Sequence, residues 1–235
     1  MTDDAEREVR RILDEYARRS REIPSDFYGL HRPANLFMRQ GQERALRDTL
    51  DRAQMLPLET QRILDVGCGT GGWFGVFENF GAHQTNIAGV ELDKTRAEIC
   101  ARHFPGADIR HGDAANLPWA DGEFAIVFQS TVFTSILDDA LKRAVASEML
   151  RVLSPCGVAI WYDFSYNNPK NPSVRGVGKG EIRRLFPGCE IWLSRVTLAP
   201  PIARRVVPFS WTIACLLEGL KLLNTHYIGV IRKRR

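Results

Sequence analysis

The sequence has no apolar run long enough to span a bilayer, for which about 20 residues are needed. The nearest candidate, Phe209 to Leu217, is followed closely by Glu218 and Lys221. The first residues, Met1 to Asp4, are polar and acidic, unlike the basic start and apolar centre of a secretory signal. We therefore expect a cytoplasmic protein without a transmembrane segment.

Cysteine pairs and dense basic patches are also missing. The five cysteines are scattered and show no C-x-x-C spacing, which favours reduced thiols over a disulfide frame or a zinc site. The net charge of +4 is mild, and no segment concentrates Lys and Arg as a duplex-binding surface does. With 44% apolar and 26% charged residues, the 235-residue chain is predicted to be globular, with no bound metal and no nucleic-acid partner.

Glycine, in contrast, is concentrated in one stretch. Ile63, Leu64 and Val66 form a short apolar run typical of a buried parallel strand. Four glycines follow within six residues, namely Gly67, Gly69, Gly71 and Gly72. Glycine permits a sharp turn and lets a bound molecule lie against the backbone. Thr70 is expected to cap a helix that begins near Gly71, and the free N–H groups of such a helix attract an anionic group.

The spacing of these glycines distinguishes two kinds of nucleotide site. A dinucleotide site is written G-x-G-x-x-G, whereas this chain has Asp65-x-Gly67-x-Gly69-x-Gly71. That pattern resembles the first motif of the class I S-adenosylmethionine-dependent methyltransferases, in the small-molecule, methyltransferase type 11-like subgroup. The resemblance implies that the glycine turn, Cys68 included, approaches the methionine part of S-adenosylmethionine. It also implies that Asp65 acts near the amino group of the cofactor.

An acid ends the expected second strand, residues 86–92. Neighbouring parallel strands share one crevice at their carboxyl ends, so Glu91 can accept both ribose hydroxyls of a nucleoside there. This geometry suits any nucleoside ligand. We assign Glu91 and the adjacent Leu92 to the cofactor, and we assign Asp93 to the cap of a helix over residues 94–104.

A third motif follows the short strand expected at residues 107–111. The sequence G-D-A-x-x-L-P-W begins at Gly112 and is followed by D-G-x-F. It is similar to the corresponding segment of many small-molecule methyltransferases. The resemblance implies that the Asp113 carboxylate accepts the adenine amino hydrogens and that the Ala114 N–H bonds the ring.

The carboxyl end of the fourth strand, residues 124–128, should border the methyl group. Amino methyltransferases of adenine and cytosine resemble one another in a [DNS]-P-P-[YFW] motif there, which this chain lacks. Methylation of nucleic-acid bases is therefore not expected. Gln129 is a candidate contact to the methionine end of the cofactor and Phe133 a candidate wall of the substrate pocket, although both also suit simple packing.

The long polar segment after the fifth strand, residues 158–162, is the second place where substrate contacts are expected. Asn167 and Asn168 offer donors and acceptors for a hydroxylated substrate such as a sugar, but Asn and Pro also simply make turns. An alcohol acceptor benefits from a general base. The weak candidates by position are His31, Asp163 and Tyr166.

The N-terminal part is predicted to form a helical cap over residues 1–55, ahead of a methyltransferase domain at 56–235. Residues 4–20 have the periodicity of an amphipathic helix, and residues 42–53 form a second one. The irregular stretch between them is a candidate lid over the ligand, with plain packing as the alternative. Its possible substrate contacts are Tyr28, Phe37 and Arg39.

The C-terminal part contains two expected strands, residues 190–198 and 226–231, separated by an apolar helix at 209–223. That helix is an insertion whose apolar surface suits core or dimer packing better than membrane contact. The predicted fold class is α/β, a Rossmann-like doubly wound seven-stranded sheet, mostly parallel with the last strand antiparallel.

The predicted function is O-methylation of a small hydroxylated metabolite (a natural product, a sugar or a lipid-linked precursor) with S-adenosylmethionine as cofactor. C- or N-methylation and non-catalytic cofactor binding remain alternatives, and an NAD(P)-dependent oxidoreductase is a weaker one. The protein is expected to be a monomer or a homodimer.

Overall fold

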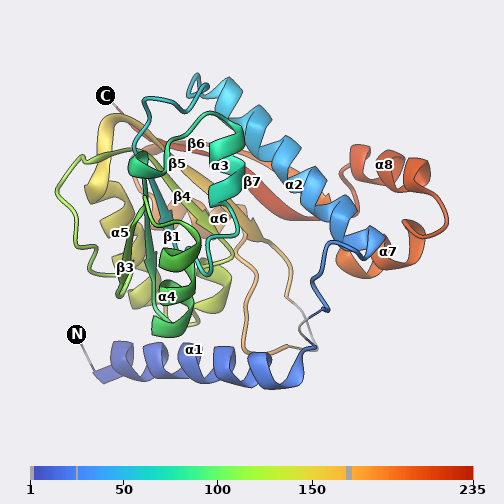
Figure 1. Ribbon diagram of the computed structural model, residues 1–235, viewed down its shortest axis with the longest axis horizontal. Coiled ribbons are helices and arrows are strands. Elements are labelled where there is room, and N and C mark those ends of the chain that lie inside the picture. Colours follow the sequence, from blue (N-terminus) through green and yellow to red (C-terminus); the bar gives the residue numbers. More distant parts are fainter. Residues whose placement is uncertain (1–2, 25, 168–170, 235) are drawn as a thin grey trace.

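The computed structural model of this chain describes residues 3–24, 26–167 and 171–234. Its centre is a seven-stranded sheet in the order β3-β2-β1-β4-β5-β7-β6 (Figure 1). β7 runs antiparallel to both β5 and β6, whereas the other neighbouring strands are parallel. The predicted sheet is therefore confirmed. The strands are β1 (Ile63–Val66), β2 (Ile87–Glu91), β3 (Asp108–His111), β4 (Phe124–Ser130), β5 (Leu153–Phe164), β6 (Cys189–Leu198) and β7 (Asn224–Lys233).

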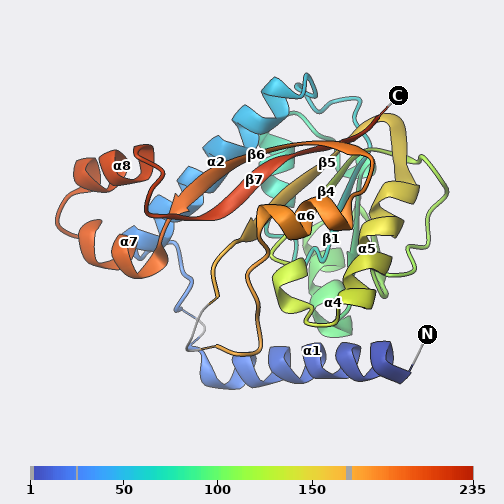
Figure 2. The same cartoon turned by 180° about the vertical axis from the view of Figure 1, so that it is seen from behind.

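Helices cover both faces of the sheet and one of its ends (Figures 1 and 2). Side chains of α2, α3 and α4 pack on one face, and those of α5 and α6 pack on the other. α1 lies across the carboxyl ends of β1, β2 and β3. The helices are α1 (Asp3–Glu22), α2 (Pro33–Arg52), α3 (Phe74–Asn79), α4 (Lys94–His103), α5 (Asp139–Val152) and α6 (Lys179–Leu185).

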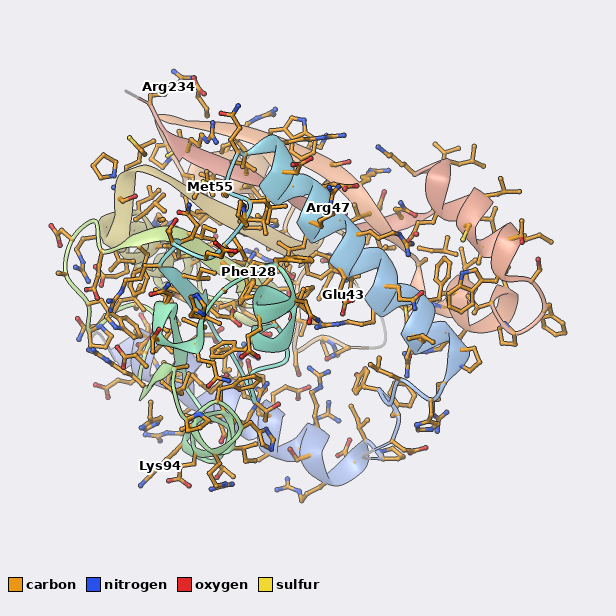
Figure 3. All side chains as sticks on the ribbon, turned by 45° about the horizontal axis from the view of Figure 1, so that its top comes forward. Glu43, Arg47, Met55, Lys94, Phe128 and Arg234 are labelled. Carbon is orange, nitrogen blue, oxygen red and sulfur yellow. The ribbon has the colours of Figure 1, made fainter. Side chains whose placement is uncertain are left out.

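The core on the α2 and α3 face is aromatic. Phe128 of β4 is fully buried, with its ring centroid 5.1 Å from that of Trp73 and 5.5 Å from that of Phe77. Figure 3 labels Phe128 in the interior, whereas Glu43 and Arg47 project from α2. Edge-on aromatic pairs of this kind stabilise a core beyond the area that they bury. The strand β4 is thereby held under the glycine turn that precedes α3.

Two predictions about the first half of the chain are wrong in detail. The irregular stretch after α1 ends at Pro33, which occupies the first turn of α2, so this helix begins well before residue 42. Thr70 caps no helix, because α3 begins only at Phe74 with Trp73 as its N-cap residue. The proposed boundary at residue 55 stays a prediction, and Leu46 of α2 packs in the same core cluster as the strands.

The predicted insertion is a pair of helices rather than one. α7 (Pro200–Val206) and α8 (Trp211–Gly219) project beyond one end of the sheet (Figures 1 and 2). They pack on the first turns of α2 around Phe37, whose ring centroid lies 5.2 Å from that of Trp211. Within the described part of the chain, no helix combines the length and the apolarity that crossing a membrane requires.

Candidate cofactor site

Five of the predicted cofactor residues line one small cavity at the carboxyl ends of the parallel strands. The cavity measures about 50 Å³. Its predicted members are Gly67, Glu91, Leu92, Asp113 and Ala114. It lies where the strand order reverses between β1 and β4, the place at which open α/β sheets bind ligands.

The glycine turn needs its glycines for two reasons. Gly67, Gly69 and Gly71 all have positive φ, at 71°, 60° and 86°. A Cβ atom on Gly71 would lie 2.5 Å from the Phe104 ring. The turn is also held against β2, because the N–H groups of Gly67 and Cys68 both donate to the Val90 carbonyl. The backbone therefore reaches the crevice with no side chain at these glycines.

Glu91 is buried beneath this turn. Its Oε2 accepts the Gly69 N–H at 2.8 Å, and its Oε1 accepts the Asp93 N–H at 2.9 Å. Asp93 in turn accepts the Arg96 N–H at 3.0 Å and caps α4, as predicted. Glu91 therefore couples the glycine turn to the start of α4. Each of its oxygens still has a further lone pair for a ligand hydroxyl.

Two other acids have buried oxygen atoms without a hydrogen-bond partner among the described residues. Neither Asp65 oxygen has one, and Asp113 Oδ2 also lacks one, while Asp113 Oδ1 accepts the Ala115 N–H. Burial raises the pKa of Asp65 well above its ordinary value, with Cys100 and Glu91 adding to the shift. A buried acceptor without a donor is costly. Asp113 lines the cavity, where its Oδ2 fits a ligand that carries amino hydrogens, such as S-adenosylmethionine, whereas Asp65 is buried and is not among the residues that line the cavity.

Cys68 and Gln129, also predicted to bind the cofactor, lie beside this cavity rather than in its wall. A hydrogen bond to Cys100 and burial raise the pKa of the Cys68 thiol, which is unreactive as a result. Gln129 is fully buried, and its Oε1 accepts the Val132 N–H at 3.2 Å. Val132 itself lines the cavity. Gln129 therefore holds a loop of the site from below.

Part of the remaining wall comes from α1, whose role the sequence did not reveal. Val9, Ile12 and Tyr16 all line the same cavity. The apolar stripe of this helix was visible in the sequence, but the surface it covers depends on tertiary packing. Burial raises the pKa of Tyr16, so its phenol stays neutral and can donate a hydrogen bond.

Two charged residues fasten α1 to the rest of the site. Glu8 accepts the N–H groups of Leu137 and Asp138 and pairs with Arg11. Arg11 donates to the carbonyls of Ser135 at 2.6 Å and Ser173 at 3.2 Å. The chain that follows β5 runs down to α1 (Figure 2). α1 is thus attached at its middle to the loops after β4 and β5.

A larger cavity of about 520 Å³ continues from the first one. The two share Tyr16, Gly67, Val132 and Ser135. Hydroxyl groups are frequent in the larger cavity, which is also lined by Ser20, Ser130, Thr131 and Tyr28. We call it the outer cavity. Its polar wall suits a small hydroxylated molecule.

Of the predicted lid residues, Tyr28 lies nearest to a ligand site. It lines both the outer cavity and a neighbouring cavity of about 370 Å³ that also contains Arg39. Arg39 donates to the Gly72 carbonyl and stacks its guanidinium 4.3 Å above the Trp73 ring. His31 is exposed in the turn before α2, with Nε2 3.9 Å from Asp26 Oδ2, and it lines neither cavity as described.

Two predicted substrate contacts are wrong because the side chains lie in the core. Phe37 is fully buried under α7 and α8. Phe133, in the short helix η2 (Phe133–Ser135), is also fully buried, and its ring centroid lies 4.8 Å from that of Trp161. Neither ring can touch a molecule in the crevice without unpacking the protein.

The structure gives no support to Asp163 as a general base. It is fully buried, Oδ1 accepts the Thr134 hydroxyl at 2.6 Å and the Phe164 N–H at 3.0 Å, and Oδ2 accepts the Thr134 N–H at 3.2 Å. These bonds tie η2 to the end of β5. Asp163 therefore positions the loop after β4, one wall of the site, and faces no described cavity.

The three remaining candidates lie in the segment after β5. Tyr166 is about half exposed, and the Arg195 guanidinium lies 5.5 Å from its ring. Asn167 accepts the Gly176 N–H at 3.0 Å, which closes the loop on itself. Asn168 lies outside the described residues. None of the described contacts brings Tyr166 or Asn167 to the outer cavity.

The burial of Asp163 leads to a prediction on pH dependence. Burial raises the pKa of Asp163 to about 7, against the hydrogen bonds from Thr134 and Phe164 and the charge of Lys142. The folded state then binds more protons than the unfolded state between about pH 4 and 7, so this group makes the free energy of unfolding fall as pH rises through that window. Stability should therefore decline less steeply from pH 4 to 7 in an Asp163→Asn variant than in the wild type.

The comparison must be made as a difference between the two proteins. Burial lowers the pKa of His226 to about 4, which gives an opposite slope in nearly the same window. His226 is present in both proteins, so its contribution cancels. Denaturant unfolding at several pH values measures the difference, and parallel profiles would show that Asp163 is ionised throughout.

Comparison with known proteins identifies the domain. Residues 63–157 match the methyltransferase domain family. Residues 63–157 therefore form a methyltransferase domain. It is 32% identical over 118 residues to a phthiotriol/phenolphthiotriol dimycocerosates methyltransferase of Mycobacterium ulcerans, covering 49% of this chain and 42% of that protein. It is 37% identical over 106 residues to a dTDP-4-amino-2,3,4,6-tetradeoxy-D-glucose N,N-dimethyltransferase of Saccharopolyspora spinosa, covering 43% and 40%.

The fold of this methyltransferase domain is also found in solved structures. A TehB-like SAM-dependent methyltransferase of Corynebacterium glutamicum superposes with a TM-score of 0.57 at 18% identity, covering 94% of this chain and 97% of that one. At this identity the similarity shows the fold alone. The chain spans about two fifths of the length of these two curated relatives.

Proposed function

We propose that this methyltransferase transfers a methyl group from S-adenosylmethionine to an oxygen atom of a small hydroxylated metabolite. The observation that carries the proposal is the convergence of the glycine turn, Glu91 and Asp113 on one crevice that opens into a hydroxyl-lined outer cavity. The acceptor classes we favour are a natural product, a sugar or a lipid-linked precursor. Bound S-adenosylmethionine supplies a methyl group that is attached to a positively charged sulfur. When the methyl group is transferred, the rest of the cofactor becomes a neutral thioether, which is a good leaving group.

In this proposal, different residues of the crevice bind different parts of the cofactor. Glu91 accepts the ribose hydroxyls, Asp113 accepts the adenine amino hydrogens through its free Oδ2, and the Ala114 N–H bonds the ring. The glycine turn lies along the methionine part, with Asp65 near the amino group. This assignment gives ligand donors to the buried oxygens of Asp65 and Asp113 that the described residues leave unpaired.

Positioning is the main task of the outer cavity. A direct displacement is accelerated by several kcal/mol when the nucleophile is held in line at about 3 Å from the methyl carbon. Ser130 ends β4 and Thr131 follows it, at the end of the sheet where the methyl group is expected, and Tyr28, between α1 and α2, lines the same cavity. We infer that these hydroxyls orient the acceptor.

N-methylation is the second candidate, and one observation favours it. Among the described residues that line the outer cavity, none is a histidine or a carboxylate. An amine that is neutral when bound needs no base to attack, whereas an alcohol benefits from one. The relative from Saccharopolyspora spinosa is named as an N,N-dimethyltransferase of an amino sugar derivative.

α1 acts as the lid in this proposal. The cavity of about 50 Å³ beneath it is far smaller than the roughly 300 Å³ or more of a typical ligand pocket. α1 must therefore move to admit a nucleoside. A Glu8→Ala variant loses the attachment to Leu137 and Asp138, and we expect S-adenosylhomocysteine to dissociate about tenfold faster from it.

Stopped-flow displacement measures this rate. Glu6→Ala is the matched control, because Glu6 lies on the exposed side of the same helix. Hydrogen exchange along α1 should also accelerate in Glu8→Ala and stay unchanged in Glu6→Ala. An unchanged dissociation rate in both variants would argue against a lid.

Two measurements test the proposed function itself. Calorimetry should show binding of S-adenosylhomocysteine and none of NAD, and the reverse result would end the proposal. Transfer of radiolabel from methyl-labelled S-adenosylmethionine into a metabolite extract should then yield a labelled ether. A labelled amine would support the second candidate, whereas binding without any transfer would indicate a non-catalytic protein.

A further inference from the structure

The outer side of α8 is apolar although it faces solvent. Ile213, Leu216 and the C-cap residue Leu220 recur at spacings of three and four residues, which places them on one side of the helix, and Phe209 lies in the turn just before it. Their exposed fractions are 52%, 65%, 65% and 91%, in that order. Leu222 and Leu223, which follow the helix in the chain, are also exposed. We call these six residues the apolar ridge.

The opposite side of α8 already makes the contacts that hold the helix to the protein. Ala214 is fully buried and Leu217 is partly buried against α2 and α7. Glu218 points inward, where it lies 3.5 Å from Arg44 of α2. A helix on the surface of a protein normally turns its polar side outward. α8 shows the reverse pattern, so its apolar ridge has no function in the fold described here.

The charged residues between positions 200 and 223 are mostly basic. Arg204 and Arg205 on α7 are exposed, as is Lys221 between Leu220 and Leu222, and the Arg204 guanidinium also lies 4.6 Å from the centre of the Phe27 ring. The only acid between residues 200 and 223 is Glu218, which is turned away from the ridge. An exposed apolar strip bordered by cations is the pattern of helices that lie in the interface of an anionic bilayer.

The same charges argue against self-association through the ridge. A symmetric dimer would bring the ridge of one copy against that of the other, together with both sets of cations. Like charges then face each other at close range, which weakens such a contact. A surface rich in phosphate groups is the complementary partner.

We propose that the apolar ridge and its three cations dock this protein on the surface of an anionic lipid bilayer. α7 and α8 project beyond the end of the sheet, so they can reach a flat surface without obstruction from the domain (Figure 1). The ridge inserts among the acyl chains near the headgroups, while Arg204, Arg205 and Lys221 contact lipid phosphates. This docking does not depend on the acceptor of the methyl group.

Vesicle sedimentation of the full chain tests the proposal. The protein should bind vesicles that contain phosphatidylglycerol much more strongly than vesicles of phosphatidylcholine alone, and high salt should weaken the binding. A Leu216→Ser/Leu220→Ser variant should lose about tenfold in the partition constant. An Arg205→Glu/Lys221→Glu variant should lose a similar factor on anionic vesicles only.

Controls separate docking from misfolding. An Arg183→Glu/Arg184→Glu variant makes the same change of charge at exposed positions on α6, and its partition should stay within about twofold of the wild type. Affinity for S-adenosylhomocysteine should be the same in all variants, which verifies the fold independently of vesicles. No binding to anionic vesicles, or a dimer in solution that the serine variant converts to monomer, would overturn the proposal.

Discussion

A Glu91→Ala variant is expected to lose about 100-fold or more of its affinity for S-adenosylhomocysteine. A hydrogen bond to a charged group contributes about 1.5–3 kcal/mol, and the proposal assigns two ribose hydroxyls to this carboxylate. Two such bonds correspond to a factor of about 100 or more in the dissociation constant. Loss of the contact with the Gly69 N–H adds to this, because the glycine turn is then free to move.

Isothermal titration calorimetry measures the dissociation constant of S-adenosylhomocysteine, and two further variants serve as comparisons. Glu91→Gln keeps the side-chain volume and one acceptor oxygen, so its loss of affinity for S-adenosylhomocysteine should be intermediate. Glu98→Ala changes an exposed carboxylate on α4, the helix that follows Glu91, and should bind as the wild type does. Wild-type affinity in Glu91→Ala would contradict the role of Glu91 at the ribose.

A Phe133→Ala variant is expected to lose about 3–5 kcal/mol of unfolding free energy, the usual cost of removing a buried aromatic ring. Phe133 is fully buried between Trp161 and Phe186, at ring-centroid distances of 4.8 and 6.2 Å. Both neighbours are themselves buried, so they cannot easily fill the space. The midpoint of urea unfolding should fall while the slope stays constant.

Phe209→Ala is the matched control, since it removes the same ring from a position that is 91% exposed. Its unfolding free energy should change by no more than about 0.5 kcal/mol. If Phe133 instead formed a wall of the substrate pocket, the two variants would be equally stable and Phe133→Ala would differ in the Michaelis constant alone. The pair of measurements separates these interpretations.

Much of the cofactor site could be predicted because it is built from short local motifs. The turn at Gly67, Glu91 after β2 and Asp113 after β3 each lie at the carboxyl end of a parallel strand. Such ends meet at one edge of a sheet whatever the rest of the chain does. A pattern of a few residues therefore suffices to place each of them, and the structure brings all three to one cavity.

The substrate side could not be predicted in the same way. Phe133 follows β4 and Asp163 lies near the end of β5, at positions that suit a pocket, but their directions depend on the partners that they meet. Phe133 turns toward Trp161, and Asp163 receives three donors from Thr134 and Phe164. These partners are not recognisable from the sequence, because the segment around Phe133 and Thr134 has no regular period from which a side-chain direction follows.

By itself the sequence determined where most strands lie along the chain, the glycine turn and the acids beside it, because periodicity and backbone sterics are local properties. Only the tertiary structure decided what the two amphipathic surfaces cover. The stripe of α1 closes the crevice through Val9, Ile12 and Tyr16, whereas the ridge of α8 remains exposed to solvent. An apolar stripe indicates that one side of a helix is to be buried, but only the tertiary packing determines the surface against which that side lies.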